Sequence, residues 1–178
     1  MALVDKHGDA IEDRWHYPSP ADSSTQGHPY FHMVEPFHII PLQQLVAIGP
    51  RLQVFPPAGT LVPNDAPLAM LRPFLDRLDL IAVEFPKFRD GRGFTLARTL
   101  RERHVFKGDI RAIGHILPDQ FRALILCGFS TVVTPDDHPP EQWSRTLRSL
   151  SSPDSSTPLL NRLIGRRALS REYVAESE

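Results

Sequence analysis

The chain has 178 residues and a formal net charge of −1 at pH 7, with 41% hydrophobic and 23% charged residues. These values are typical of one globular domain with a hydrophobic core. The near-neutral charge argues against nucleic acid as the main partner, because binding to phosphates needs a net basic surface. No apolar stretch reaches the roughly 20 residues of a membrane helix, and residues 1–15 lack the apolar core of a signal peptide. We therefore expect a cytoplasmic protein that binds no membrane.

Residues 1–48 begin with a predicted β-hairpin, because two β-rich segments flank the sequence KHGD, which places Gly8 in a turn. The polar sequence SPADSSTQGHP (19–29) predicts a loop. The sequence IPLQQLVAI (40–48) predicts a short helix with Pro41 in its first turn.

Residues 50–135 predict the body of the fold, because apolar strand-like runs alternate there with helical patterns. We predict strands at 52–55, 79–85, 109–114 and 130–133, and helices at 66–78, 93–106 and 118–129. Six prolines between Pro50 and Pro73 predict that this part is otherwise irregular or only briefly helical. The alternation is typical of right-handed βαβ crossovers and a parallel sheet.

The predicted fold class is therefore α/β, with about four parallel strands in successive βα units, an N-terminal hairpin and a loose C-terminal tail. The sheet is either small and open or half-barrel-like. If the strands lie in sequential order, all crossover helices cover one face, and the other face must be covered by residues 1–48, by the tail or by another subunit. We predict one domain over residues 1–135, with its core at 50–135. Residues 136–178 then form a helix (139–150), a linker and a partly disordered tail.

The most promising site residues follow the predicted strands, since ligands collect at the carboxyl ends of parallel strands. The candidates for anion binding are Lys87, Asp90, Gly91, Arg92, Gly93, His115, Asp119 and Gln120. No catalytic residue is assigned. His115 is a candidate acid–base group or a partly buried histidine bonded to backbone, and Asp119 is more easily explained as a helix cap.

The turn DGRG (90–93) admits two interpretations. In the first, Gly91 and Gly93 let backbone N–H groups approach a ligand at a helix start, while Arg92 holds an anion in a bidentate manner. In the second, Asp90 caps the helix, Arg92 pairs with a neighbouring carboxylate and the glycines serve the turn.

Cysteine chemistry is limited by the single residue Cys127. One thiol excludes an internal disulfide, a Cys-x-x-Cys redox pair and a four-cysteine cluster site. Because no basic residue lies near it in the sequence, we expect Cys127 to be a buried small hydrophobe. His28 and His32 have a four-residue spacing, but Pro29 between them argues against zinc. We predict no metal and no bound cofactor.

Three segments together resemble a known family: EFPKFRDGRGFTLARTLRER (84–103), GDIRAIGHILPDQ (108–120) and CGF (127–129). They resemble the bacterial family of a domain of unknown function numbered nine-three-four, which is often labelled an oxidoreductase and is commonly encoded beside assimilatory sulfite reductase. Two positions depart from the family pattern, since His115 stands where an acidic residue is common and Ser130 where aspartate is common. Among the candidate residues, the family match includes Lys87, the turn 90–93, Asp119 and Gln120.

The resemblance implies a role in sulfur assimilation, around sulfite reduction. The first hypothesis is an accessory protein that binds the sulfite reductase or its electron donor. The alternatives are a small enzyme or carrier that binds a sulfite- or phosphate-like anion at the turn 90–93, or an oxidoreductase that uses a flavin or nicotinamide cofactor. The sequence leaves open whether the chain forms a homo-oligomer.

Overall fold

The fold is described from a computed structural model for residues 1–18, 33–49, 53–54 and 56–151. These residues form a seven-stranded sheet whose central strands lie in sequential order. From one edge to the other the strands are β2 (Ala10–Ile11), β1 (Ala2–Asp5), β9 (Thr131–Thr134), β8 (Asp109–Gly114), β7 (Leu80–Phe85), β6 (Ala58–Pro63) and β4 (His38–Pro41). The run from β9 to β4 is parallel, and β1 is antiparallel to both β9 and β2.

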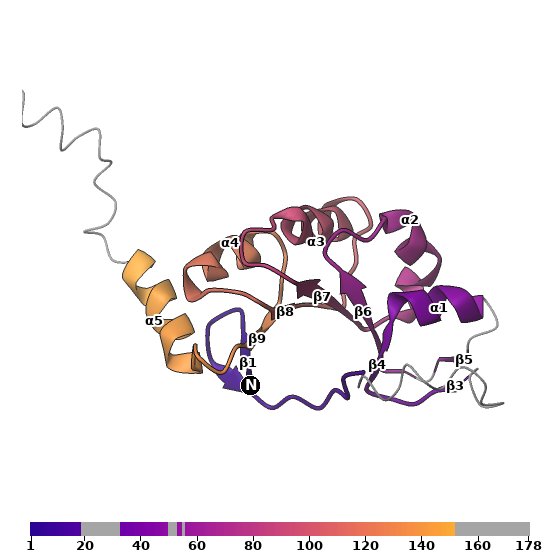
Figure 1. Ribbon diagram of the computed structural model, residues 1–178, viewed down its shortest axis with the longest axis horizontal. Helices are drawn as coiled ribbons and strands as arrows, with labels where there is room; N and C mark the ends of the chain where they lie inside the picture. The colour runs from indigo at the N-terminus through magenta and orange to yellow at the C-terminus, as the bar shows by residue number, and fades with distance from the viewer. Residues whose placement is uncertain (19–32, 50–52, 55, 152–178) are drawn as a thin grey trace, which may run out of the picture.

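The helices lie on the outer side of a curved sheet, as Figure 1 shows for α1 to α4. The helical elements are α1 (Leu42–Ile48), α2 (Leu68–Leu71), the 3-10 helix η3 (Arg72–Arg77), α3 (Arg92–Glu102), the 3-10 helix η4 (Pro118–Gln120), α4 (Phe121–Leu126) and α5 (Pro140–Ser151). The predicted α/β class with parallel βα units is confirmed, and the half-barrel-like form describes the arrangement. The predicted N-terminal hairpin is also confirmed, with Gly8 in its turn at φ +83°. No helix within the described ranges is long and apolar enough to span a bilayer.

The central strand β7 buries side chains on both faces of the sheet. Ile81 and Val83 point into the main core beneath the helices, whereas Leu80 and Ala82 belong to a smaller cluster on the inner face. All four side chains are fully buried. An apolar run that alternates between two buried faces is what a parallel strand covered on both sides requires. Glu84 alone among the residues of β7 is exposed.

A segment that we call the inner strap, residues 12–17, covers the inner face. It runs from β2 across the open side of the sheet to β4 at the opposite edge (Figure 1). There the N–H of His16 donates to the Phe37 carbonyl at 2.8 Å, and the N–H of Ile39 donates to the His16 carbonyl at 2.9 Å. Trp15 and Tyr17 pack against the inner-face cluster. The second face of the sheet is therefore covered by residues 1–48, which was one of the three possibilities that the sequence left open.

Two sequence-based strand assignments need correction. The strand predicted at 52–55 does not join the main sheet, because β5 (Gln53–Val54) pairs with β3 (Met33–Val34) in a separate two-stranded sheet. The proline-rich stretch was expected to be irregular, but it contains β6 between β4 and β7. Its prolines are compatible with a central strand because Pro56 and Pro57 precede it and Pro63 ends it.

Helix α5 confirms the helix predicted at 139–150. Its Trp143 is fully buried, its ring lies edge-on to Phe121 with centroids 5.3 Å apart, and its indole N–H donates to the His138 carbonyl at 3.0 Å. The helix therefore packs against the rest of the fold beside α4. The predicted loop at 19–29 and the predicted linker and tail beyond residue 151 lie outside the described residues, and the domain boundary at residue 135 stays a prediction.

Candidate functional site

The parallel register brings the loops that follow β7 and β8 to one rim of the sheet. The backbone N–H of His115 donates to the Phe85 carbonyl at 2.8 Å. The side chain of Gln120 joins the two loops, because its Nε2 donates to the Phe88 carbonyl at 2.6 Å while its Oε1 accepts the Leu117 N–H at 3.2 Å. The candidate residues from both loops therefore lie at the same rim, which is where ligands bind in most α/β proteins.

The turn at 90–93 is held by one guanidinium shared between two carboxylates. Arg92 Nε donates to Asp90 Oδ1 at 2.9 Å, and Arg92 Nη1 donates to Asp65 Oδ2 at 2.9 Å in the loop that follows β6. Asp90 Oδ1 also accepts the backbone N–H of Arg92 at 3.3 Å. The hydrogen bonds from Arg92 lower the pKa of the Asp90 carboxyl below its ordinary value of 3.8. The turn thus ties the start of α3 to the neighbouring βα loop.

The two glycines of this turn meet different surroundings. A Cβ on Gly93 would lie 2.6 Å from Cζ of Phe85, so this glycine lets α3 approach β7 closely. A Cβ on Gly91 would meet nothing within 4 Å. Gly93 therefore serves helix-to-sheet packing, and only Gly91 leaves open space at the turn.

The rim loop, which we define as residues 86–90, presents an aromatic ring and two cations to solvent. The Phe88 side chain is 43% exposed, and the Arg89 guanidinium lies over its ring, 5.3 Å from the centroid. Lys87 is exposed, and neither its ammonium group nor the Asp119 carboxylate forms a hydrogen bond or ion pair with the described residues. The loop is fixed from below through Asp90 and the Phe88 carbonyl, while its side chains stay accessible.

A pocket of about 640 Å³ lies on the inner side of the same rim. Its residues come from the inner strap, from β1, and from the ends of β7, β8 and β9 with the loops that follow them. They are Met1, Ala2, Leu3, Asp13, Tyr17, Glu84, Ile113, Gly114, His115, Val133, Thr134, Pro135, Asp136 and Asp137. The side chains of Glu84 and His115 form no hydrogen bond or ion pair with other described residues. This inner pocket therefore combines apolar walls with unpaired polar groups.

A buried arginine organises the base of the inner pocket. Arg111 on β8 is 3% exposed, and its Nη1 donates to Asp13 at 2.8 Å and to the Tyr17 hydroxyl at 2.7 Å. Its Nη2 and Nε groups bond Asp109 and Thr131. Burial raises the pKa of the Tyr17 hydroxyl above its ordinary value of 10.0, despite the opposing effect of the nearby Arg111 charge. The phenol therefore stays protonated and donates to Asp13 Oδ2 at 2.8 Å.

The sequence-based candidates did not include this inner group. Glu84 and Arg111 carried a usable signal, because each is a charged residue inside a largely apolar strand. Glu84 is the one charged residue of LIAVEF, and Arg111 accompanies Asp109 in DIRAIG. Asp13 and Tyr17 carried none, since they lie about a hundred residues before Arg111 and reach it only through the path of the inner strap.

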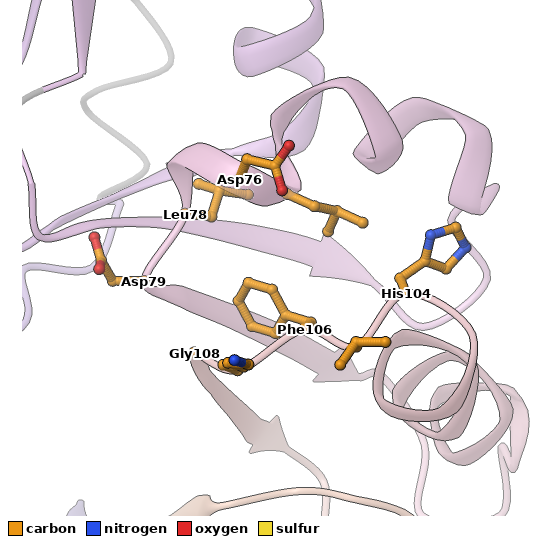
Figure 2. A pocket seen from close by; sticks show the side chains of 9 residues that line it. Asp76, Leu78, Asp79, His104, Phe106 and Gly108 are labelled. Atoms are coloured by element: carbon orange, nitrogen blue, oxygen red, sulfur yellow. The ribbon is translucent and has the colours of Figure 1, made fainter.

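A second pocket, of about 500 Å³, lies at the opposite end of the sheet (Figure 2). Figure 2 shows Asp79 and Gly108 where β7 and β8 begin, with the Phe106 ring beside Gly108. Asp79 Oδ2 accepts the Ala58 N–H at 2.9 Å, and the Asp79 carbonyl accepts the Asp109 N–H at 2.7 Å. These groups join the starts of three neighbouring strands, which is a stabilising role.

The prediction that Cys127 is a buried small hydrophobe is wrong. It is partly exposed, and Arg98 Nη2 donates to its sulfur at 3.5 Å. The arginine lies 29 positions earlier in the chain, so the sequence around the cysteine gave no sign of it. Within the described part of the chain, no three histidine, cysteine or acidic side chains are grouped to hold a metal ion.

The comparisons with known proteins agree with the family resemblance. Residues 59–156 match the family described as "Bacterial protein of unknown function (DUF934)". No curated protein and no solved structure matches the chain. The match spans β6 to the end of α5, and so contains the turn at 90–93, Gln120 and Arg111. Because it covers more than half of the 178 residues, the chain belongs to the DUF934 family.

Proposed function

We propose that this chain is an accessory protein of assimilatory sulfite reduction, which binds the sulfite reductase or its electron donor through the rim loop. The pathway is suggested by the sequence resemblance, which implies that members of this family are encoded beside assimilatory sulfite reductase. The chain belongs to that family. The observation that carries the binding role is a loop that is fixed in position while Phe88 and Arg89 remain exposed.

The rim loop has the composition of a protein contact site. Aromatic residues and arginine are enriched at interface centres and supply most of the binding energy. A loop that is already ordered loses little conformational entropy on binding. Asp90, Arg92 and Gln120 provide that order. The partner surface that fits is an apolar depression for Phe88 bordered by carboxylates for Lys87 and Arg89.

The test is a pull-down of the tagged chain from cells that grow on sulfate as sole sulfur source. We expect sulfite reductase or its electron donor to be recovered with the wild-type chain and lost with Phe88→Ala. The control is Leu126→Ala, which also truncates an exposed apolar side chain to alanine, at a 72% exposed site at the end of α4 away from the rim. Arg92→Ala should weaken recovery without abolishing it, because it removes the support of the loop and not its contact residues. Equal recovery with Phe88→Ala and with the wild-type chain would contradict the proposal.

A small-anion site at the same turn is the second candidate. It is supported by the unpaired Lys87 ammonium and the open space beside Gly91. It ranks second because an anion would have to compete with Asp90 and Asp65 for the Arg92 guanidinium. Calorimetry with sulfite, sulfate and phosphate separates the two: heat that is lost in Lys87→Ala supports an anion site, and no heat with any of the three removes it.

A further inference from the structure

We propose that the inner pocket binds a small organic amine, with its ammonium group on Glu84 and its apolar body against the walls formed by β1, β8 and β9. This site is separate from the rim loop, which lies on the other side of the same rim. The proposal rests on the position of Glu84, on the charge balance of the pocket and on the apolar character of its walls.

Glu84 is the first observation. It lies on β7, a strand with neighbours on both sides, yet it is exposed while the other five residues of that strand are buried. On the inner face, the two preceding positions of β7 carry the buried side chains of Leu80 and Ala82. The alternation that buries those two therefore places a carboxylate at the third, where the strand reaches the inner pocket. It has no hydrogen-bond or ion-pair partner among the described residues.

The charge balance of the pocket is the second observation. Four carboxylates line it, those of Asp13, Glu84, Asp136 and Asp137. Three of them already face a basic group: Asp13 pairs with Arg111 at 2.8 Å, Asp136 with the Met1 ammonium, and Asp137 lies 3.8 Å from the His138 ring. Among these four carboxylates, Glu84 alone has no basic partner within the described residues. The Met1–Asp136 pair at the same lip is itself an ammonium–carboxylate contact of the kind proposed.

The shape and walls of the pocket are the third observation. A volume of about 640 Å³ is that of a typical small-molecule site, which lies between about 300 and 1,000 Å³. Leu3, Ile113 and Val133 supply apolar surface from three adjacent strands. The base is rigid, because the network of Arg111 with Tyr17 and Asp13 fixes the strap beneath the pocket. An apolar ligand body with one positive charge matches the apolar walls and the unpaired Glu84 carboxylate. The pocket also contains the imidazole of His115, but its four carboxylates favour a cation over an anion.

Binding of three probes that share one ring tests the inference. The probes are 2-phenylethylamine, 2-phenylethanol and 3-phenylpropionate, which are cationic, neutral and anionic. Their binding is followed by NMR titration, because fragments of this size bind in about the millimolar range. We expect the amine to bind about ten-fold more tightly than the alcohol and the carboxylate not to bind. We also expect the shifted resonances to include Ile113 and Val133.

Substitutions then test whether Glu84 is the residue that binds the ammonium group. Glu84→Gln keeps the shape of the side chain and should weaken the amine about ten-fold while leaving the alcohol unchanged. Asp119→Asn is the matched control, because it removes an unpaired rim carboxylate outside the pocket. The inference is overturned if the three probes bind equally, if the carboxylate binds best, if Glu84→Gln leaves the amine affinity unchanged, or if none of the probes shifts the pocket resonances.

Discussion

At the scale of single residues, the inner side of the protein is organised around Arg111. A buried guanidinium is tolerated only when its charge is paired and its donors are satisfied. Here Asp13 and Asp109 provide the charges, and Tyr17 and Thr131 provide further oxygens. Because Asp13 and Tyr17 belong to the inner strap, this one side chain anchors the strap to β8.

The Tyr17 hydroxyl should make stability depend on pH in the alkaline range. Its pKa in the folded protein is raised above 10.0 by burial, so the folded state retains a proton that the unfolded chain loses near pH 10. The stabilising contribution is complete below about pH 10 and is lost as the pH rises through the folded pKa. Urea unfolding at about pH 8 and about pH 10.5 should therefore show a larger loss for the wild-type chain than for Tyr17→Phe. Equal losses in the two chains would show that Tyr17 titrates normally.

At the scale of elements, the turn at 90–93 connects β7 to α3 and sets their distance. Its two glycines have separate roles, one in close packing and one at an open surface. Neither has a positive φ, so space and not backbone strain decides what each position accepts.

Alanine substitutions should separate the two glycines. Gly93→Ala should lower the free energy of unfolding by about 1 to 3 kcal/mol, because its methyl group meets the buried Phe85 ring. Gly91→Ala should be neutral or stabilising by up to about 1 kcal/mol, since its methyl group meets nothing and restricts the unfolded chain. Chemical denaturation of the two variants gives the comparison, and a loss at Gly91 equal to that at Gly93 would refute the assignment of roles.

The elements also show what local sequence can predict. The parallel βα units, α1 and α5 followed from apolar periodicity and from the placement of proline, which are local properties. The strand β6 was missed because proline was taken to break structure, although Pro63 lies at its last position, where a strand tolerates it. The candidate residues of the two rim loops could be predicted from the order of strands. The pairing of Arg92 with Asp65 could not, because it depends on which βα loops become neighbours.

At the scale of the whole molecule, the inner strap closes a half-barrel. The sheet alone would leave the side chains of Ile39, Leu80 and Ala82 uncovered on its inner face. The strap covers them with Trp15 and Tyr17 and joins β2 at one edge to β4 at the other. The two tryptophans consequently report on opposite faces, Trp15 on the inner face and Trp143 among the helices.

Unfolding should therefore be a single cooperative event seen from both faces. In the variant Trp15→Phe the remaining Trp143 reports on the helical face, and in Trp143→Phe the remaining Trp15 reports on the inner face. We expect the fluorescence transition of each variant to coincide with its own far-ultraviolet circular dichroism transition, because both cores share one sheet. A fluorescence transition of Trp15 that precedes loss of helix would show instead that the strap opens on its own.

The pairing of β1 with β9 has a consequence for biosynthesis. Ala2 faces Thr134 across this ladder, so β1, which can pair with β2 early, must wait for β9 before it joins the main sheet. Until then the inner strap lacks its anchor on β8 as well, since Arg111 is also made late. Contacts between such distant residues slow folding and lengthen the time for which apolar surface is exposed. The nascent chain should therefore depend on chaperones until residue 134 has emerged, and fusions placed after β9 should be tolerated better than truncations before it.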